Sequence, residues 1–143
     1  MGDRSNDDRV VAGVSPTDES RAARRGQANE QARAFAIGAA GLLQDLHFED
    51  VLILDVRGLS DVTDYILIAS GTSNRQIKSV GGDVQRLGRD MGLERYGRDE
   101  DDEGSWLVLD FVDVVVHLFE PVTRSHYDLE TMWGDAPRVP WQR

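Results

Sequence analysis

The stretch Tyr65-Ile66-Leu67-Ile68-Ala69-Ser70-Gly71-Thr72-Ser73-Asn74 joins a buried strand to a helix, and it sets the fold class. Residues 65–69 are a continuous apolar run rich in β-branched side chains, which is typical of a strand covered on both faces. Gly71 ends that run, and the three polar residues after it suit the first position of a helix. A buried strand leading into a capped helix indicates an α/β domain.

The flanking sequence predicts further elements of the same kind. Apolar residues recur at three- and four-residue spacing over residues 28–46, which predicts a first helix. Residues 51–56 predict a second buried strand, with turn residues between it and the strand at 65–69. The helical period continues from Ile77 to Met91, although Gly81 and Gly82 weaken this helix and suggest a close packing contact.

Residues 106–111 and 113–119 alternate between apolar and other side chains, which predicts two more strands. Their shared inner face should point into the core, and it carries Leu107, Leu109, Phe111, Val114, Val116 and Leu118. Pro121 ends the second strand, and Thr123 caps a final helix expected from about residue 124 to residue 133. The expected order is α-β-β-α-β-β-α, in a single-domain mixed sheet with helices.

An acidic run separates the middle helix from these last strands. Residues 99–103 are all Asp or Glu, between Gly97 and Gly104. A run of like charges is usually solvated, so we interpret it as a hairpin loop or linker. A metal site built from its carboxylates is the weaker alternative.

The length of 143 residues with 40% apolar side chains is enough for one domain with one core. The first 27 residues hold five basic and five acidic side chains and almost nothing large and apolar. We therefore expect a disordered N-terminal tail over residues 1–27, a folded domain over residues 28–137 and a C-terminal tail over residues 138–143.

The net charge is −10, from 16 Lys and Arg against 26 Asp and Glu, and it works against wide docking on a phosphate backbone. The absence of cysteine removes disulfides, thiolate metal clusters and thiol nucleophiles. No apolar run approaches the length of a membrane span, and the acidic residues near the start argue against a transit peptide. A cytoplasmic location is expected.

The outer face of the last two strands is unusual for a solvated face. It carries Trp106, Val108, Asp110, Asp113, Val115, His117 and Phe119. One interpretation is that the final helix covers this face with Tyr127, Leu129, Met132 and Trp133. The other is an exposed apolar patch rimmed by charge, as in many protein-binding surfaces. Both can hold in part.

Three blocks of sequence carry a family resemblance. The first runs from Asp64-Tyr65 to Ile68-Ala69-Ser70-Gly71-Thr72-Ser73-Asn74-Arg75-Gln76. The second joins Trp106 and Asp110 to Asp113-Val114-Val115-Val116-His117-Leu118-Phe119. The third joins Arg124 to Tyr127-Asp128-Leu129-Glu130 and Trp133-Gly134-Asp135-Ala136-Pro137. In this order, over roughly residues 30–137, they resemble the ribosomal silencing factor family, also called Iojap. Val112 departs from the pattern, because the family usually has glycine before Asp113.

The resemblance implies a nucleotidyltransferase-like α/β fold without the catalytic carboxylate pair, acting without catalysis or a cofactor. It implies binding to the large ribosomal subunit, through the ribosomal protein numbered fourteen in its series, and a block on joining of the small subunit. An acidic domain suits a basic ribosomal protein and predicts little direct nucleic-acid contact. A homodimer is the alternative partner state. The candidate partner-binding residues are Trp106, Asp110, Asp113, Val115, His117, Arg124, Tyr127, Glu130 and Trp133.

Two other functions are weighed against this one. A nucleotidyltransferase needs a Gly-Ser turn for phosphates and two carboxylates one residue apart on a strand. The Gly71-Thr72-Ser73 turn meets the first need, but Asp110 and Asp113 are three positions apart. The same turn could bind an anion at the helix N-terminus, or it could be a plain helix cap. His117 is either a contact within the patch or a strand imidazole hydrogen-bonded to Asp110, and no metal-ligand spacing is present among the histidines.

Overall fold

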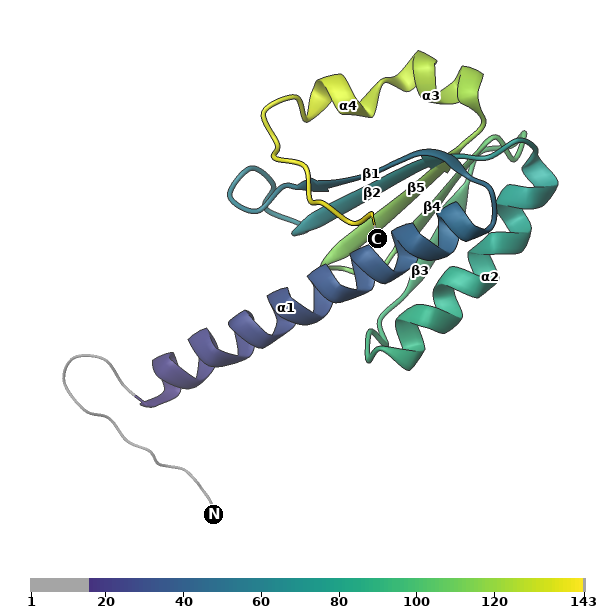
Figure 1. Ribbon diagram of the computed structural model, residues 1–143. Coiled ribbons are helices and arrows are strands. Elements are labelled where there is room, and N and C mark those ends of the chain that lie inside the picture. The colour runs from purple at the N-terminus through teal and green to yellow at the C-terminus, as the bar shows by residue number, and fades with distance from the viewer. Residues whose placement is uncertain (1–15, 143) are drawn as a thin grey trace.

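The computed structural model describes residues 16–142, and the side chains of residues 20–142 (Figure 1). Nine elements follow one another along the chain. They are α1 (Pro16–Asp45), β1 (Glu49–Asp55), β2 (Tyr65–Ser70), α2 (Asn74–Asp90), β3 (Gly97–Glu100), β4 (Trp106–Asp110), β5 (Val114–Phe119), α3 (Pro121–Tyr127) and α4 (Leu129–Met132).

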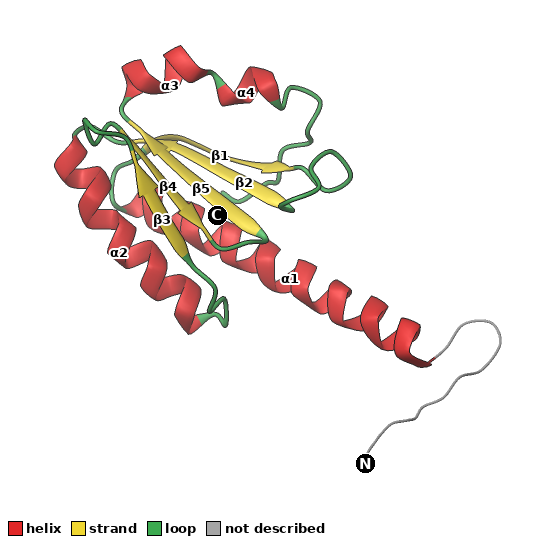
Figure 2. Cartoon of the chain, turned by 180° about the vertical axis from the view of Figure 1, so that it is seen from behind, coloured by secondary structure: helices red, strands yellow, loops and turns green. Residues whose placement is uncertain are grey.

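The five strands form one mixed sheet in the order β1-β2-β5-β4-β3. The central pair, β2 and β5, is parallel, and the other three pairs are antiparallel. Helices α1 and α2 lie against one face of the sheet, and α3 and α4 lie over the other (Figures 1 and 2). The mixed α/β single domain predicted from the sequence is confirmed.

The main core lies between the sheet and the helices α1 and α2. All six side chains predicted for the inner face of β4 and β5 are buried there. Helix α1 contributes Phe35 and Ala39, and α2 contributes Ile77 and Val84, all with no exposed surface. Burying a side chain of this size contributes about 1.5–3 kcal/mol, so this layer supplies much of the stability. Every residue of β2 is buried, as its continuous apolar sequence predicts.

Helix α2 begins with the predicted cap. The hydroxyl of Ser73 accepts a hydrogen bond from the backbone N–H of Gln76 at 3.1 Å. Of the two adjacent glycines in this helix, Gly81 lies against β3 and β4, where a Cβ atom would come within 2.6 Å of Arg98 Nη1. A Cβ at Gly82 would meet nothing within 4 Å. Close packing therefore explains Gly81 and leaves Gly82 unexplained.

Strand β3 is the largest departure from the expected order. Gly97–Glu100 pairs with β4 at the edge of the sheet, with Asp99 opposite Val108, where a loop was predicted. All four residues of β3 are exposed, so neither face selects apolar side chains and no alternation appears in the sequence. Only residues 101–105 form the hairpin connection.

Helix α1 begins at Pro16 rather than at residue 28. Part of the predicted disordered tail, residues 16–27, is therefore helical, and residues 1–15 lie outside the described residues. Alanine and arginine are good helix formers, so a helix anchored by Phe35 extends through them without further packing. Neither α1 nor any other helix between residues 16 and 142 is both long and apolar enough to cross a membrane.

The C-terminal residues are packed, whereas a tail was predicted from residue 138. Val139 and Trp141 are buried in the main core. The backbone N–H of Val139 donates to the carbonyl of Ile53 at 2.9 Å, and Trp141 Nε1 donates to the carbonyl of Val51 at 3.2 Å. This segment therefore covers the β1 edge of the sheet.

Two backbone positions with positive φ shape the last third of the chain. Asp128, with φ 49°, divides the predicted final helix into α3 and α4. Val112, with φ 75°, forms the turn between β4 and β5, and the N–H of Asp113 donates to the carbonyl of Phe111 at 2.9 Å. The turn is thus a tight γ-turn with valine at its centre, where the family resemblance implies glycine.

Candidate protein-binding surface

Helices α3 and α4 cover only part of the outer face of the sheet. A second, smaller core forms beneath them, over β1, β2 and the end of β5, and its buried members are Leu54, Val56, Ile66, Ile68, Phe119, Leu129 and Ala136. The part of this face over β4 and the middle of β5 is not fully covered. Helices α3 and α4 therefore cover one half of this face, and the other half stays partly exposed.

We call the uncovered half the aromatic patch, which consists of Trp106, Val108, Val115, His117 and Tyr127. All five side chains are partly or largely exposed. The Trp106 ring stacks on Phe119 with centroids 4.9 Å apart and contacts the Tyr127 ring at 4.4 Å. Trp106 is thus anchored on the second core while part of its surface stays open.

His117 is bonded within the patch. The indole Nε1 of Trp106 donates to His117 Nδ1 at 3.1 Å. The predicted partner, Asp110, faces Val115 in the register and accepts from the backbone N–H of Val112 at 2.8 Å instead. Burial lowers the pKa of His117 to about 4, so the imidazole is neutral at pH 7. His117 therefore adds no positive charge to the patch.

An acidic rim borders the aromatic patch on the β3 side. Asp99, Glu100 and Asp101 line a surface pocket of about 240 Å³ together with Trp106, Val108 and Tyr127. Asp101 accepts from the backbone N–H groups of Ser105 at 2.8 Å and Trp106 at 3.1 Å. Burial raises the pKa of Asp101, but these hydrogen bonds and one from the Ser105 hydroxyl together lower it below its usual value. Asp101 thus holds the first residues of β4 in place, and it also provides a negative charge beside the aromatic patch.

Arg124, one of the predicted partner-binding residues, is bonded within the fold. Its side chain is 9% exposed, and its Nε donates to Glu130 Oε2 at 3.1 Å. Its Nη1 donates to the hydroxyl of Ser70, at the end of β2, at 2.9 Å. These bonds tie α3 and α4 to the sheet, and they hold the side chains of Arg124 and Glu130 in place.

The other predicted contact residues lie apart from the patch. Trp133 packs against the second core. Asp110 and Asp113 lie at the β4–β5 turn, at the opposite end of β4 from Trp106. Burial raises the pKa of Asp64, and the charge of Asp113 raises it further, so these two carboxylates are close to one another. The structure thus brings together Trp106, Val115, His117 and Tyr127 from the predicted set.

Sequence reasoning missed the acidic rim, because it assigned residues 97–104 to a loop. The pairing of β3 with β4 places Asp99 opposite Val108 and so on the outer face. No apolar alternation distinguishes this strand from a solvated run of acids, and no other feature of the sequence indicates it.

The Gly71-Thr72-Ser73 turn is occupied by the protein's own groups. The amide oxygen of Gln76 accepts from the backbone N–H of Thr72 at 2.7 Å and from its hydroxyl at 2.9 Å, while Ser73 caps Gln76. The N–H groups of Thr72 and Gln76 and the Thr72 hydroxyl are therefore already bonded within the protein. Among residues 16–142, no group of three or more His, Asp or Glu side chains is arranged to hold a metal ion.

Comparison with known proteins agrees with the fold. Residues 29–143 match the family described as "Ribosomal silencing factor during starvation". The ribosomal silencing factor RsfS of Bacillus subtilis is 39% identical over 99 residues, which are 69% of this chain and 84% of that protein. The mouse protein named mitochondrial assembly of ribosomal large subunit protein 1 is 33% identical over 98 residues, which are 64% of this chain and 42% of that protein. A crystal structure from Chromobacterium violaceum, 31% identical, superimposes with a TM-score of 0.65 over 80% of this chain and 92% of that one. The chain belongs to the ribosomal silencing factor family.

Proposed function

We propose that this protein represses translation by binding the large ribosomal subunit and blocking the joining of the small subunit. Binding would be to the ribosomal protein numbered fourteen in the large-subunit series, as the family resemblance implies, with no catalytic step. Family membership supports the ribosomal association and the silencing. The name of the mouse relative refers to assembly of the large subunit, which agrees with the choice of subunit.

The observation that carries this proposal is the aromatic patch beside its acidic rim. A partly exposed Trp106 beside an exposed Tyr127 is typical of the anchors of a protein interface. Asp99 is exposed at its edge, opposite Val108, in a chain of net charge −10. Such a surface complements a basic protein and is repelled by bare RNA, which supports a ribosomal protein as the direct contact.

A second copy of this chain is the alternative occupant of the patch. Such a contact would bring together two chains that each carry a net charge of −10, which opposes it. Sedimentation velocity over a range of concentrations decides this point. A monomer at micromolar concentration removes the dimer as the resting state.

The proposal is tested by co-sedimentation of the protein with purified large subunits. Small subunits are then added, and the yield of joined ribosomes is measured. The wild-type chain should pellet with large subunits and reduce the yield of joined ribosomes. Tyr127→Ala should weaken both effects. Val62→Ala should leave both unchanged, because Val62 is an exposed residue of the β1–β2 loop. Failure of the wild-type chain to pellet, or pelleting without any reduction in joining, would overturn the proposal.

A further inference from the structure

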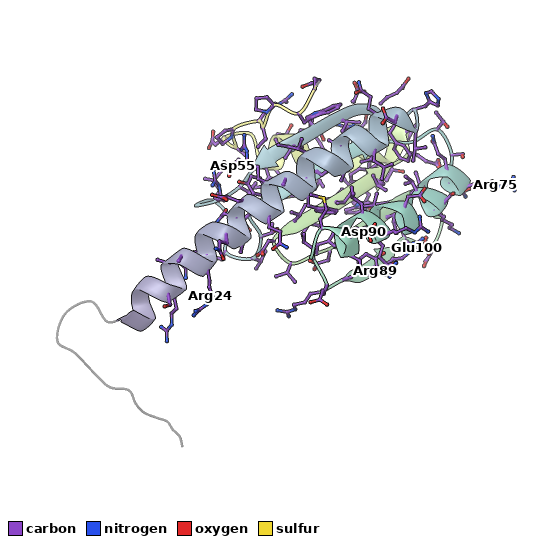
Figure 3. The ribbon with its side chains drawn as sticks, turned by 60° about the horizontal axis from the view of Figure 1, so that its bottom comes forward. Arg24, Asp55, Arg75, Arg89, Asp90 and Glu100 are labelled. Atoms are coloured by element: carbon purple, nitrogen blue, oxygen red, sulfur yellow. The ribbon has the colours of Figure 1, made fainter. Side chains whose placement is uncertain are left out.

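The first part of α1 forms an arm that projects beyond the sheet (Figure 1). Residues 20–29 of this arm hold Arg21, Arg24 and Arg25 and no Asp or Glu. All three arginines are exposed, and Figure 3 shows Arg24 on the projecting segment. Residues 20–28 lie outside the part of the chain that matches the family, so family membership assigns them no role.

The three arginines share one side of the arm. Residues three and four positions apart are neighbours on a helix, so Arg21 adjoins both Arg24 and Arg25. Like charges at these spacings destabilise a helix by a few tenths of a kcal/mol per pair, roughly 0.2–0.5. Residues 20–27 bury no side chain that would offset this repulsion. An external polyanion would relieve it.

The arm also carries this charge away from the acidic body. Residues 1–29 have equal numbers of basic and acidic side chains, so the whole net charge of −10 belongs to residues 30–143. Arg21 lies about 16 Å along the helix from Ala32, the first buried residue, at a rise of about 1.5 Å per residue. That is about twice the Debye length of ~8 Å at physiological ionic strength. The field of the body is therefore largely screened at the outer arginine.

Arg25, the innermost of the three, lies within electrostatic reach of the body. Burial raises the pKa of Asp64, and Arg25 is among the groups that lower it in part. Arg21 lies about one helical turn further out. The three arginines thus lie on α1 between the pair Asp18 and Glu19, which precedes them, and the acidic body.

We propose that Arg21, Arg24 and Arg25 bind phosphate groups of ribosomal RNA, beside the protein contact made by the aromatic patch. This inference rests on the proposed function, because it takes the large subunit as the target. Guanidinium groups match phosphate oxygens in paired hydrogen bonds, and each phosphate contact releases condensed counterions. The expectation of little direct nucleic-acid contact used the net charge alone and did not separate the arm from the body.

The test measures the affinity of the full chain for purified large subunits at several KCl concentrations. The arm variant is Arg21→Gln/Arg24→Gln/Arg25→Gln, since glutamine keeps helix propensity and removes charge. The matched control is Arg75→Gln/Arg86→Gln/Arg89→Gln, which removes three exposed arginines from α2, away from the arm (Figure 3). Circular dichroism checks that both variants keep their helix content.

The arm variant should bind at least tenfold more weakly than wild type at low salt. The slope of log K against log[KCl] should fall in magnitude by about 2, because three phosphate contacts each contribute about 0.7–0.9. The control should keep the wild-type slope. Equal slopes for wild type, arm variant and control would overturn the arm proposal while leaving the proposed function in place. A loss of affinity with an unchanged slope would also overturn the arm proposal, because it would indicate that the arm contacts a ribosomal protein and not phosphate groups. Absence of wild-type binding would instead refute the proposed function on which this inference rests.

Discussion

Trp106 and His117 are diagonal neighbours across the antiparallel β4–β5 pair, and the indole N–H of one donates to Nδ1 of the other at 3.1 Å. Nδ1 must keep its lone pair to accept this bond, so the bond holds the imidazole in its neutral state. Burial acts in the same direction and lowers the pKa of His117 to about 4. The order of the aromatic patch is therefore tied to the protonation state of one side chain.

Acid should destabilise the fold through His117. The unfolded imidazole titrates near 6.5 and the folded one near 4, so between these values the unfolded chain binds more protons. Stability from this residue is complete above pH 6.5 and is lost as the pH falls toward 4, by about 1.4 kcal/mol per pH unit. Chemical denaturation of wild type and His117→Gln at several pH values measures the difference.

The exposed His126 provides the control for that experiment. His126→Gln should keep the wild-type pH profile, whereas His117→Gln should flatten it. Parallel profiles for wild type and His117→Gln would contradict the assignment.

Trp106→Ala should separate binding from folding. We expect a loss of affinity for large subunits of at least about 30-fold, equivalent to about 2 kcal/mol, since Trp106 lies at the centre of the patch. Because its ring also rests on Phe119, a stability loss of about 1–2 kcal/mol is expected, below the ~3–5 kcal/mol of a fully buried aromatic. Urea denaturation and co-sedimentation measure the two effects. A large stability loss with unchanged affinity would place Trp106 in the core alone.

Val112→Gly should stabilise the protein. A β-branched residue is strained at φ 75°, and relief of about 1–2 kcal/mol exceeds the ~0.5–1 kcal/mol of added chain entropy that glycine brings to the unfolded state. Thermal unfolding of this variant should show a higher midpoint. Val62→Gly is the control, because Val62 is exposed and has no positive φ, and it should lower the midpoint or leave it unchanged.

Gly88 and Gly82 should respond in opposite ways to alanine. A Cβ at Gly88 would approach Phe111 Cε1 to 2.6 Å in the main core, so Gly88→Ala should destabilise by about 1–3 kcal/mol. Gly82→Ala meets open space and should stabilise by up to about 1 kcal/mol through helix propensity. Equilibrium unfolding of both variants checks the pair, and equal effects would refute the packing explanation.

Arg124→Met should cost far more stability than Arg86→Met. The first leaves Glu130 partly buried without its cation, and breaking a buried pair typically costs about 3–5 kcal/mol. The second removes an exposed pair with Asp83, worth about 0.2–1 kcal/mol. Denaturation curves compare the two, and similar losses would show that the Arg124 pair is screened like a surface pair.

Periodicity predicted the parts of the fold that bury one face. The six inner side chains of β4 and β5, the buried strand β2 and the Ser73 cap follow from patterns that span a few residues. Strand β3 could not be predicted in this way, because both of its faces are exposed and its pairing depends on the edge that β4 offers. The packing of Val139 and Trp141 likewise depends on neighbours distant in sequence.

The candidate surface was predictable only as a face. Alternation placed Trp106 and His117 on the outer side of the sheet, but it could not say which half α3 and α4 cover. That division depends on the left-handed Asp128 and on a bond between Arg124 and Ser70, which are 54 positions apart. The hydrogen bond from Trp106 to His117 was also not predicted. By sequence spacing alone, Asp110 on the same face is an equally suitable partner for His117.

The parallel pair β2 and β5 also governs when this chain can fold. The hydrogen bonds at the centre of the sheet join Tyr65–Ser70 to Val114–Phe119, so they form only after a long loop containing α2, β3 and β4 has closed. During synthesis, α1 and the β1–β2 hairpin leave the ribosome before β5 does. Their apolar faces are incompletely covered until β5 pairs with β2. A chain interrupted before β5 therefore lacks the middle of its sheet and leaves unpaired the edge of β2 that would bond to β5, which makes truncated products prone to aggregation.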